Sequence, residues 1–250
     1  TTDSIFILHL FLNGLNLKGE TVFEVIQSYS ITNSDDLFIE NHIKTSNLVK
    51  TVAKVGLQMG LSKDFAYAKW FGLDTESYSD RYKSGLIGWH SFPIENLFFK
   101  YVRPQESGNR AKTQKLYLES NKTNIFIQFL ESDFNFSIYP YTDQNIDTAK
   151  HINKLIENDY WTFNLDYKQA GIGGATCGPG ARYMYLLEQN QYDFTLHINT
   201  NGMGSDKIML HLLQFIVAGL KNGSIYALLA LGFTIVYAAT GAINFAQGEF

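Results

Sequence analysis

The chain has 250 residues, of which 45% are hydrophobic and 18% are charged, and its formal net charge at pH 7 is −4. These values describe an ordinary soluble domain, and the near-neutral balance gives no electrostatic reason to expect nucleic acid as a partner. The single cysteine, Cys177, excludes an internal disulfide and fits a reducing compartment. The chain starts at Thr1 without a basic-then-apolar leader, so we expect no signal peptide and interpret the chain as a truncated segment.

Short runs of branched and aromatic residues predict β-strands up to about residue 199. The first two are IFILHLFL (5–12) and TVFEVIQSYSI (21–31), which show partial alternation of apolar and polar side chains. The runs that follow are DLFIENHIK, TVAKVGLQM, KLYLES, NIFIQFL, FNFSIYPY, WTFNLDYKQ and YDFTLHIN. Because clusters of Asn, Asp, Gly, Pro and Ser separate them, we expect many short strands joined by turns, as in an all-β sandwich.

One stretch departs from the strand pattern. In residues 142–158 the apolar side chains of Ile146 and Ala149 lie at roughly helical spacing, and Thr142 or Asp143 is suited to cap a helix N-terminus. We therefore predict one short helix here, lying across a sheet edge.

Four stretches rich in turn-forming, charged and aromatic residues are interpreted as loops. They are WFGLDTESYSDRYKSG (70–85), YVRPQESGNR (101–110), YPYT (139–142) and NLDYKQAGIGGATCGPG (164–180). In the first, Glu76, Asp80 and Arg81 lie beside Tyr78. Such clusters suit sugars, whose faces stack on rings while their hydroxyls take bidentate hydrogen bonds. The alternative is that Arg81 and Arg110 fix the loops through structural ion pairs.

These four stretches, in this order and spacing, resemble the C-terminal β-domain of β-galactosidases of glycoside hydrolase family 2. In the two-chain enzymes of that family, this domain is the separate small chain. The resemblance covers about residues 20–199, and four collinear motifs are more specific than any one alone. It implies an antiparallel β-supersandwich, like that of galactose mutarotase, for residues 1–199.

The resemblance assigns a structural role to most of the motif residues. These are Glu76, Tyr78, Asp80, Arg81, Pro104, Gln105, Glu106, Arg110, Asp166, Gly171 and Gly173. Some relatives carry, after the last of these glycines, a tryptophan that reaches into the active site of the neighbouring barrel. Here the run is ATCGP, so that aromatic platform is absent, and Thr176, Cys177 and Gly178 are candidates for the rim of the substrate pocket.

Retaining glycosidases need two carboxylates that flank the scissile bond. The resemblance implies that both come from glutamates of a TIM barrel that precedes this domain and also carries the ligands for Mg and Na. We therefore expect no catalytic residue, no metal site and no cofactor in this chain, and no hydrolysis of lactose by the chain alone. The six histidines also lack metal-ligand spacing. The implied partners are the barrel, or a separate large chain, and a galactoside.

The last part of the chain has a different composition. After a Gly- and Asn-rich connector (200–208), the stretch from Asn222 to Gly248 contains no Lys, Arg, Asp or Glu. A stretch of this length can cross a bilayer as a helix, whereas a buried soluble helix rarely runs so long without a charged face. We therefore predict a transmembrane-type α-helix in residues 209–250 and membrane association through it, with residues 1–208 in the cytoplasm.

Two motifs in this segment, GSIYALLALG and GAINFAQGEF, resemble the N-terminus of a LivH-like permease subunit of branched-chain amino acid ABC transporters. The chain thus resembles two unrelated pieces that meet near Met209, each of them truncated. A joined reading frame and an evolved fusion both fit this pattern.

Three hypotheses of function follow. The leading one is a non-catalytic domain of a β-galactosidase that supports the active site of the barrel. The second is a stand-alone sugar-binding or complementing small subunit. The third makes the permease the gene product, with residues 1–208 as a fused or spurious upstream segment.

Overall fold

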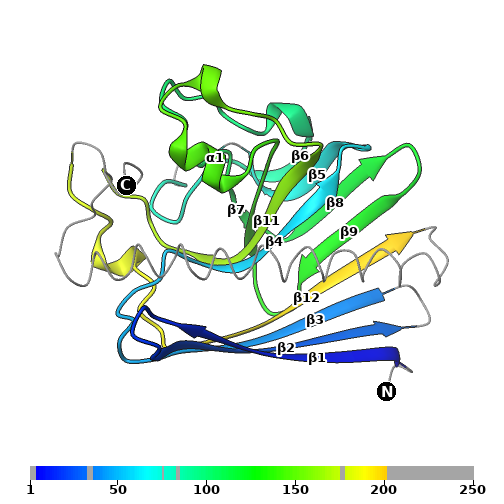
Figure 1. The fold of residues 1–250 in the computed structure, drawn as a ribbon. Helices are drawn as coiled ribbons and strands as arrows, with labels where there is room; N and C mark the ends of the chain where they lie inside the picture. The colour runs from blue at the N-terminus through cyan, green and yellow to red at the C-terminus, as the bar shows by residue number, and fades with distance from the viewer. Residues whose placement is uncertain (1–3, 33–35, 75, 83–84, 175–177, 202–250) are drawn as a thin grey trace.

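The computed structural model describes residues 4–32, 36–74, 76–82, 85–174 and 178–201, which form two antiparallel β-sheets (Figure 1). The larger sheet has eight strands. In spatial order they are β1 (Ser4–Leu15), β2 (Thr21–Thr32), β3 (Asp36–Thr45), β12 (Gln191–Asn201), β9 (Asn124–Phe129), β8 (Lys115–Ser120), β5 (Phe65–Leu73) and β6 (Ile87–Pro93). The prediction of an all-β, antiparallel sandwich is confirmed for this part of the chain.

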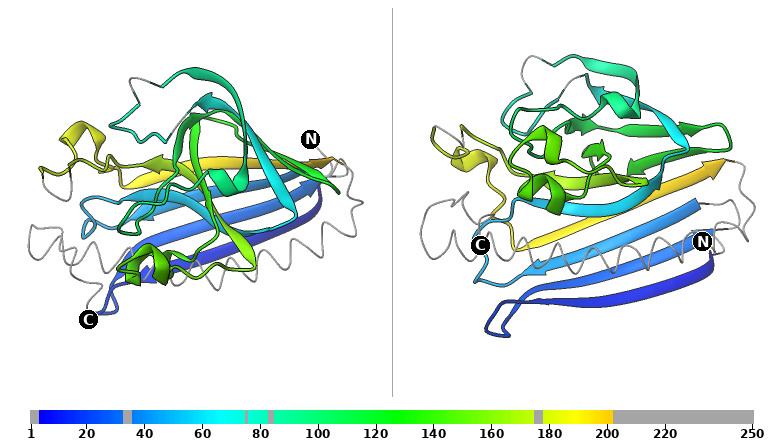
Figure 2. Two further views of the ribbon diagram at one scale, coloured as in Figure 1. Left: turned by 90° about the horizontal axis from the view of Figure 1, so that it is seen from above. Right: turned by 45° about the horizontal axis from the view of Figure 1, so that its top comes forward.

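The smaller sheet has four strands and lies over part of the larger one (Figure 2). Its strands, in spatial order, are β4 (Lys54–Ser62), β11 (Tyr160–Gln169), β10 (Phe134–Tyr139) and β7 (Arg110–Thr113). The register of β4 on β11 shifts between Asp166 and Lys168, which marks a bulge near the end of β11. A bulge of this kind changes the direction in which the following side chains point.

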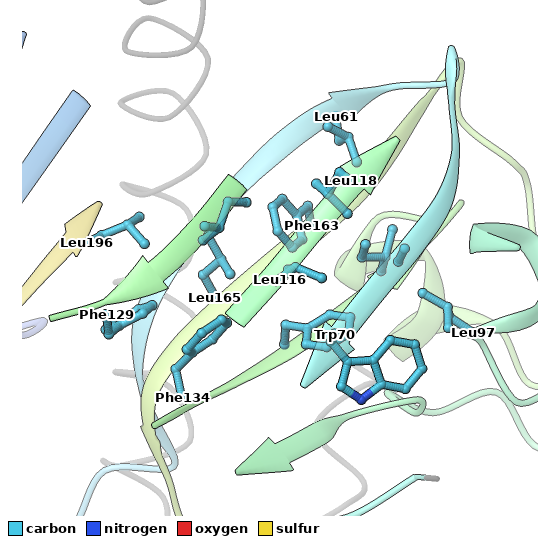
Figure 3. Close-up of a cluster of buried hydrophobic side chains, with 14 of the residues drawn as sticks. Leu61, Trp70, Leu97, Leu116, Leu118, Phe129, Phe134, Phe163, Leu165 and Leu196 are labelled. Carbon is cyan, nitrogen blue, oxygen red and sulfur yellow. The ribbon is translucent and has the colours of Figure 1, made fainter. Parts of the chain in front are cut away.

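The core fills the space between the two sheets because apolar side chains alternate along the strands. Leu116 and Leu118 of β8 are fully buried, and Tyr117 between them points to the opposite face. From the smaller sheet, Phe163 and Leu165 of β11 enter the same apolar cluster (Figure 3). Burial of this one cluster therefore holds the sheets together.

The prediction that residues 70–85 form a loop is wrong for the first part of this stretch. Strand β5 continues to Leu73, and Trp70 is fully buried in the core, where its Nε1 donates to the carbonyl oxygen of Leu73 over 2.7 Å. The sequence pattern predicted no strand at β5, because turn-forming and charged residues follow Trp70 closely.

The predicted helix is also shorter than expected. Helix α1 (Asp143–Thr148) begins at the predicted cap, where the Thr142 hydroxyl accepts from the backbone N–H of Asn145. The chain becomes extended at Ala149, and the Asn145 side chain then accepts from the backbone N–H of Ile156. This contact folds the following segment, which includes the 3-10 helix η2 (Ile152–Lys154), back on the helix. Ile146 packs with aromatic rings of the loops and β10.

Among the residues described above, no helix is both long and apolar enough to cross a membrane. The predicted transmembrane segment, residues 209–250, lies outside them, as do residues 202–208 of the connector and two of the rim candidates, Thr176 and Cys177. These predictions stay predictions.

Candidate functional site

The carboxylate of Glu76 joins two of the motif loops. Its Oε1 accepts from the hydroxyl of Tyr78 over 2.9 Å and from the backbone N–H of Gly108 over 2.8 Å, and its Oε2 accepts from the hydroxyl of Tyr101. The hydrogen bond from the Tyr101 hydroxyl to Glu76 is the main reason why the pKa of Tyr101 is raised to about 12. Burial, followed by Glu76, raises the pKa of Tyr78. Glu76 thus acts as a fixed acceptor between loops that are 32 positions apart.

A second pair reinforces the same junction. The backbone N–H of Ser77 donates to the carbonyl of Asn109 over 2.8 Å, and the Asn109 side chain donates back to the carbonyl of Ser77 over 2.7 Å. The Ser77 hydroxyl also accepts from the backbone N–H of Ala111. The sequence analysis did not select Ser77 or Asn109, although both lie within the motifs that it quoted.

Arg110 fills the space beneath these loops. It is only 3% exposed, and its guanidinium lies over the rings of Trp70 and Phe99, at 5.7 and 5.6 Å from their centroids. The Nη1 atom of Arg110 donates to the carbonyl oxygen of Leu97 over 2.9 Å and also to the carbonyl oxygen of Gly108. Burial lowers the pKa of Arg110 to about 10. Arg110 thus contacts carbonyl groups and aromatic rings, whereas the alternative in the sequence analysis placed it in an ion pair.

Asp80 and Arg81 hold the loop that follows β11. The carboxylate of Asp80 accepts from the backbone N–H of Gly173 over 2.8 Å and of Ile172 over 3.3 Å, and Arg81 donates to the carbonyl of Gly173. Gly173 has a φ of +61°, and a Cβ on Gly171 would lie 2.9 Å from the Asp80 carboxyl carbon. Both positions therefore favour glycine.

The remaining candidate residues of these loops lie apart from the contact of Asp80 and Arg81 with Gly173. Pro104 is buried, whereas Gln105 is exposed. Of the three rim candidates only Gly178 is described, and it is exposed in the turn that the backbone hydrogen bond from Gly174 to Pro179 closes.

Glu106 and Asp166 belong to a partly buried polar network on the outer face of the smaller sheet. The ammonium of Lys54 lies 2.9 Å from Oε1 of Glu106. Asp166 is 3% exposed, and its Oδ2 has no hydrogen-bond partner among the described residues. Burial raises the pKa of Asp166 to about 7, although Lys54 opposes the shift. Burial lowers the pKa of Lys54, but the attraction of Glu106 and nearby aspartates outweighs it, so this pKa is raised overall.

The network continues along the sheet through side chains that the sequence analysis missed. The amide nitrogen of Gln58 donates to Asn164 over 2.7 Å and to Asp143 over 3.1 Å. The amide nitrogen of Asn164 donates to the hydroxyls of Ser137 over 3.0 Å and Tyr139 over 2.9 Å. The alternation of Asn164 and Asp166 in NLD was the available signal, because residues two apart in a strand share a face.

The described residues contain no group of three or more His, Cys, Asp or Glu side chains placed to hold a metal ion. Among the motif carboxylates, those of Glu76 and Asp80 accept from backbone N–H groups and hydroxyls, and those of Glu106 and Asp166 lie near Lys54. These features define a two-sheet β-domain whose charged residues maintain the shape of its loops.

The comparison with known families identifies this domain more closely. The model of the beta galactosidase small chain family matches residues 11–198. The chain therefore belongs to the beta galactosidase small chain family. The match agrees with the resemblance expected for residues 20–199 and ends before the permease-like segment.

Curated relatives are similar over the same part. A β-galactosidase of Actinobacillus pleuropneumoniae is 31% identical over 166 residues, which are 66% of this chain and 16% of that protein. A β-galactosidase of Vibrio cholerae is 31% identical over 145 residues, which are 57% of this chain and 14% of the relative. The chain thus spans about one sixth of the length of the relatives that it matches.

Solved structures with a partly similar arrangement include galactose 1-epimerase of Lactobacillus acidophilus. It is 10% identical, has a TM-score of 0.38, and the match covers 78% of this chain and 62% of that one. A putative aldose 1-epimerase of Escherichia coli is also 10% identical, with a TM-score of 0.39 and coverage of 81% and 68%. Likeness at this level is too low to carry a conclusion.

We predict that Glu76→Gln loosens the junction of the loops. A neutral amide accepts more weakly than a carboxylate and cannot accept from all three donors, so the free energy of unfolding should fall by about 1–3 kcal/mol. The pKa of Tyr101 should fall from about 12 towards 10 because its main cause is removed. Urea unfolding and NMR titration of labelled tyrosines measure these effects. Glu119→Gln, at an exposed position of β8, is the control. An unchanged Tyr101 titration would contradict the assignment.

We predict that Asp166→Asn removes a pH dependence of stability. The Asp166 carboxyl has a pKa of about 7 when folded, against an ordinary value of 3.8 for aspartic acid, so it binds its proton more tightly in the folded state. Its contribution therefore favours folding at low pH and is lost as the pH rises from about 4 to about 7. Relative to the variant, the wild-type chain should lose stability over this range in urea unfolding. Parallel curves for the two proteins would refute the prediction, and Asp133→Asn, at a half-exposed position, is the control.

Proposed function

We propose that the chain is the non-catalytic C-terminal domain of a β-galactosidase, an enzyme that hydrolyses terminal β-galactosides such as lactose. Catalysis then belongs to a TIM-barrel portion, in the same polypeptide or in a separate large chain. The proposal draws on the family match over residues 11–198 and on relatives in which the matched part is about one sixth of the protein. In this proposal the domain is a galactose mutarotase-like supersandwich, and Mg and Na bind to the barrel.

The observation that carries the proposal is the way in which the motif carboxylates are used. Glu76 accepts three hydrogen bonds from two loops, and Asp80 accepts two from the backbone after β11. A nucleophile and an acid/base must instead face the sugar from opposite sides of the scissile bond. The carboxylates in these motifs fix loop shape, and we infer that the fixed loops form the surface that supports the catalytic portion and the rim of its galactoside pocket.

Complementation tests this proposal directly. The chain is co-expressed with a β-galactosidase large chain that ends before its own small-chain segment, and lactose hydrolysis is measured. We expect no activity from either piece alone and activity from the pair, with less from the Glu76→Gln variant because its loops are less well held. Hydrolysis by the chain alone would refute the non-catalytic role, and a stable chain that fails to rescue would refute the supporting role.

We also propose that residues 209–250 associate with a membrane through a transmembrane-type helix, as in the N-terminus of a LivH-like permease. The observation that favours this is the absence of Lys, Arg, Asp and Glu from Asn222 to Gly248. An uncharged segment of this length matches the thickness of a bilayer when helical. The upstream domain would then be a fused or spurious partner of a permease fragment, with residues 1–208 on the cytoplasmic side.

Fractionation of the full chain tests the membrane proposal. We expect the chain to remain in the membrane pellet after alkaline extraction, because its uncharged segment is more stable in lipid than in water. Replacing Leu228 and Leu231 by arginine should move it to the supernatant, since each central charge costs about 2.5–3.5 kcal/mol on insertion scales. The same double change to alanine is the control. Equal distribution of all three proteins would overturn the proposal.

A further inference from the structure

A continuous row of aromatic rings crosses one face of the larger sheet. We call it the aromatic stripe, and its members are Phe38, His197, Phe126, Tyr117, Trp89 and Phe71, in this order. The distances between the centroids of successive rings are 4.7, 5.9, 5.0, 6.0 and 5.4 Å. The rings come from β3, β12, β9, β8, β6 and β5, of which the first four are neighbours in the sheet (Figure 1).

The stripe lies on the face that points away from the smaller sheet. Leu116, Leu118 and Leu196 fill the core, so the neighbouring odd-numbered Tyr117 and His197 point to the other side. Trp89, which lies opposite Phe71 in the register of β5 and β6, is 51% exposed. None of the six rings belongs to either apolar cluster found in the described part of the chain.

A row of rings on this face is not explained by folding alone. A sheet with one solvated face usually presents polar side chains there, and contiguous apolar surface commonly marks a binding site. Exposing the Trp89 ring gives up the free energy that its burial would supply. The stripe therefore calls for a ligand that covers it.

Hydrogen-bonding groups hold the stripe in place and border it. Nε2 of His197 lies 2.7 Å from Asp36 Oδ1, and its Nδ1 lies 3.1 Å from the amide nitrogen of Gln128. Asn199 also donates to Asp36 over 2.7 Å. The ammonium of Lys69 lies 5.4 Å from the centroid of the Trp89 ring. The rings are thus held by neighbours that carry both donors and acceptors.

We propose that the aromatic stripe binds a neutral oligosaccharide, with pyranose faces stacked on the rings and hydroxyls bonded to the bordering polar groups. Strands in a sheet are about 4.8 Å apart, which is comparable to the length of one sugar unit, so rings on successive strands meet successive units. The planes of successive rings are inclined by 10°, 80°, 40°, 44° and 61°, so the stripe is a twisted surface rather than a flat one. This inference does not depend on the proposed function.

The charges beside the stripe favour a neutral ligand. The exposed residues of the same face include Lys69 and Lys115 but also Glu40 and Glu119, so neither sign predominates. A nucleic acid would require a clear excess of basic groups.

Affinity electrophoresis of the full chain tests the proposal. The gels contain soluble neutral polysaccharides, namely a galactan, a xyloglucan and a mixed-linkage glucan, and a detergent without a sugar headgroup keeps the chain in solution. We expect at least one of them to retard the wild-type chain. Trp89→Ala and Tyr117→Ala should each lower the affinity roughly tenfold, the size expected for losing one stacked ring.

Phe92→Ala is the matched control, because Phe92 lies on the same strand as Trp89, on the opposite face, and is 45% exposed. Its affinity should equal that of the wild type. A loss as large as that of Trp89→Ala would overturn the proposal, as would a wild-type chain that no glycan retards. If these variants instead lose only the ability to associate with a β-galactosidase large chain, the stripe is a protein contact and the proposal is wrong.

A measurement on the unchanged chain avoids any effect of substitution on folding. Tryptophan oxidation by N-bromosuccinimide, mapped by mass spectrometry, should modify Trp89 and spare the fully buried Trp70. The glycan that retards the chain should protect Trp89. Equal oxidation of Trp89 with and without that glycan would place the bound sugar elsewhere and overturn the proposal.

Discussion

The shape of the motif loops depends on the carboxylate of Glu76. Because it accepts from Tyr78, Tyr101 and Gly108, it fixes two loops that leave the sheets at different points. The cation of Arg110 fills the space below and stacks on Trp70, so the loops are also attached to the core. A charged acceptor with several donors is strong because each hydrogen bond is charge-assisted. Such an arrangement holds the two loops in one shape relative to each other and to the core.

The smaller sheet has two very different faces. Its inner face contributes apolar side chains to the common core, whereas its outer face carries the network of Lys54, Gln58, Asn164 and Asp166. Buried polar groups are stable only when they are paired, and most members of this network are. The Oδ2 atom of Asp166 is the exception, and its raised pKa follows from the same burial.

The two faces of the larger sheet also carry different kinds of side chain. One face closes the core, and the other presents the aromatic stripe together with charged side chains of both signs. A strand achieves this through alternation alone, since Leu116 and Tyr117 are adjacent in sequence but lie on opposite sides. The core and the aromatic stripe therefore lie on opposite faces of the same strands.

Local periodicity by itself predicted most of the strands up to about residue 199, although not β5, β6 and β7. The local sequence also limited the cap of α1 to Thr142 or Asp143, because capping involves only neighbouring residues, and the structure uses Thr142. The tertiary structure alone decided the rest. It placed Trp70 in strand β5. It also folded the chain back after α1, where the Asn145 side chain accepts from the backbone N–H of Ile156. Finally, it brought Gln58 into contact with Asn164, which lies 106 positions away in the sequence. Such partners depend on strand order and register, which no local pattern contains, and the aromatic stripe exists only because that order sets its rings side by side.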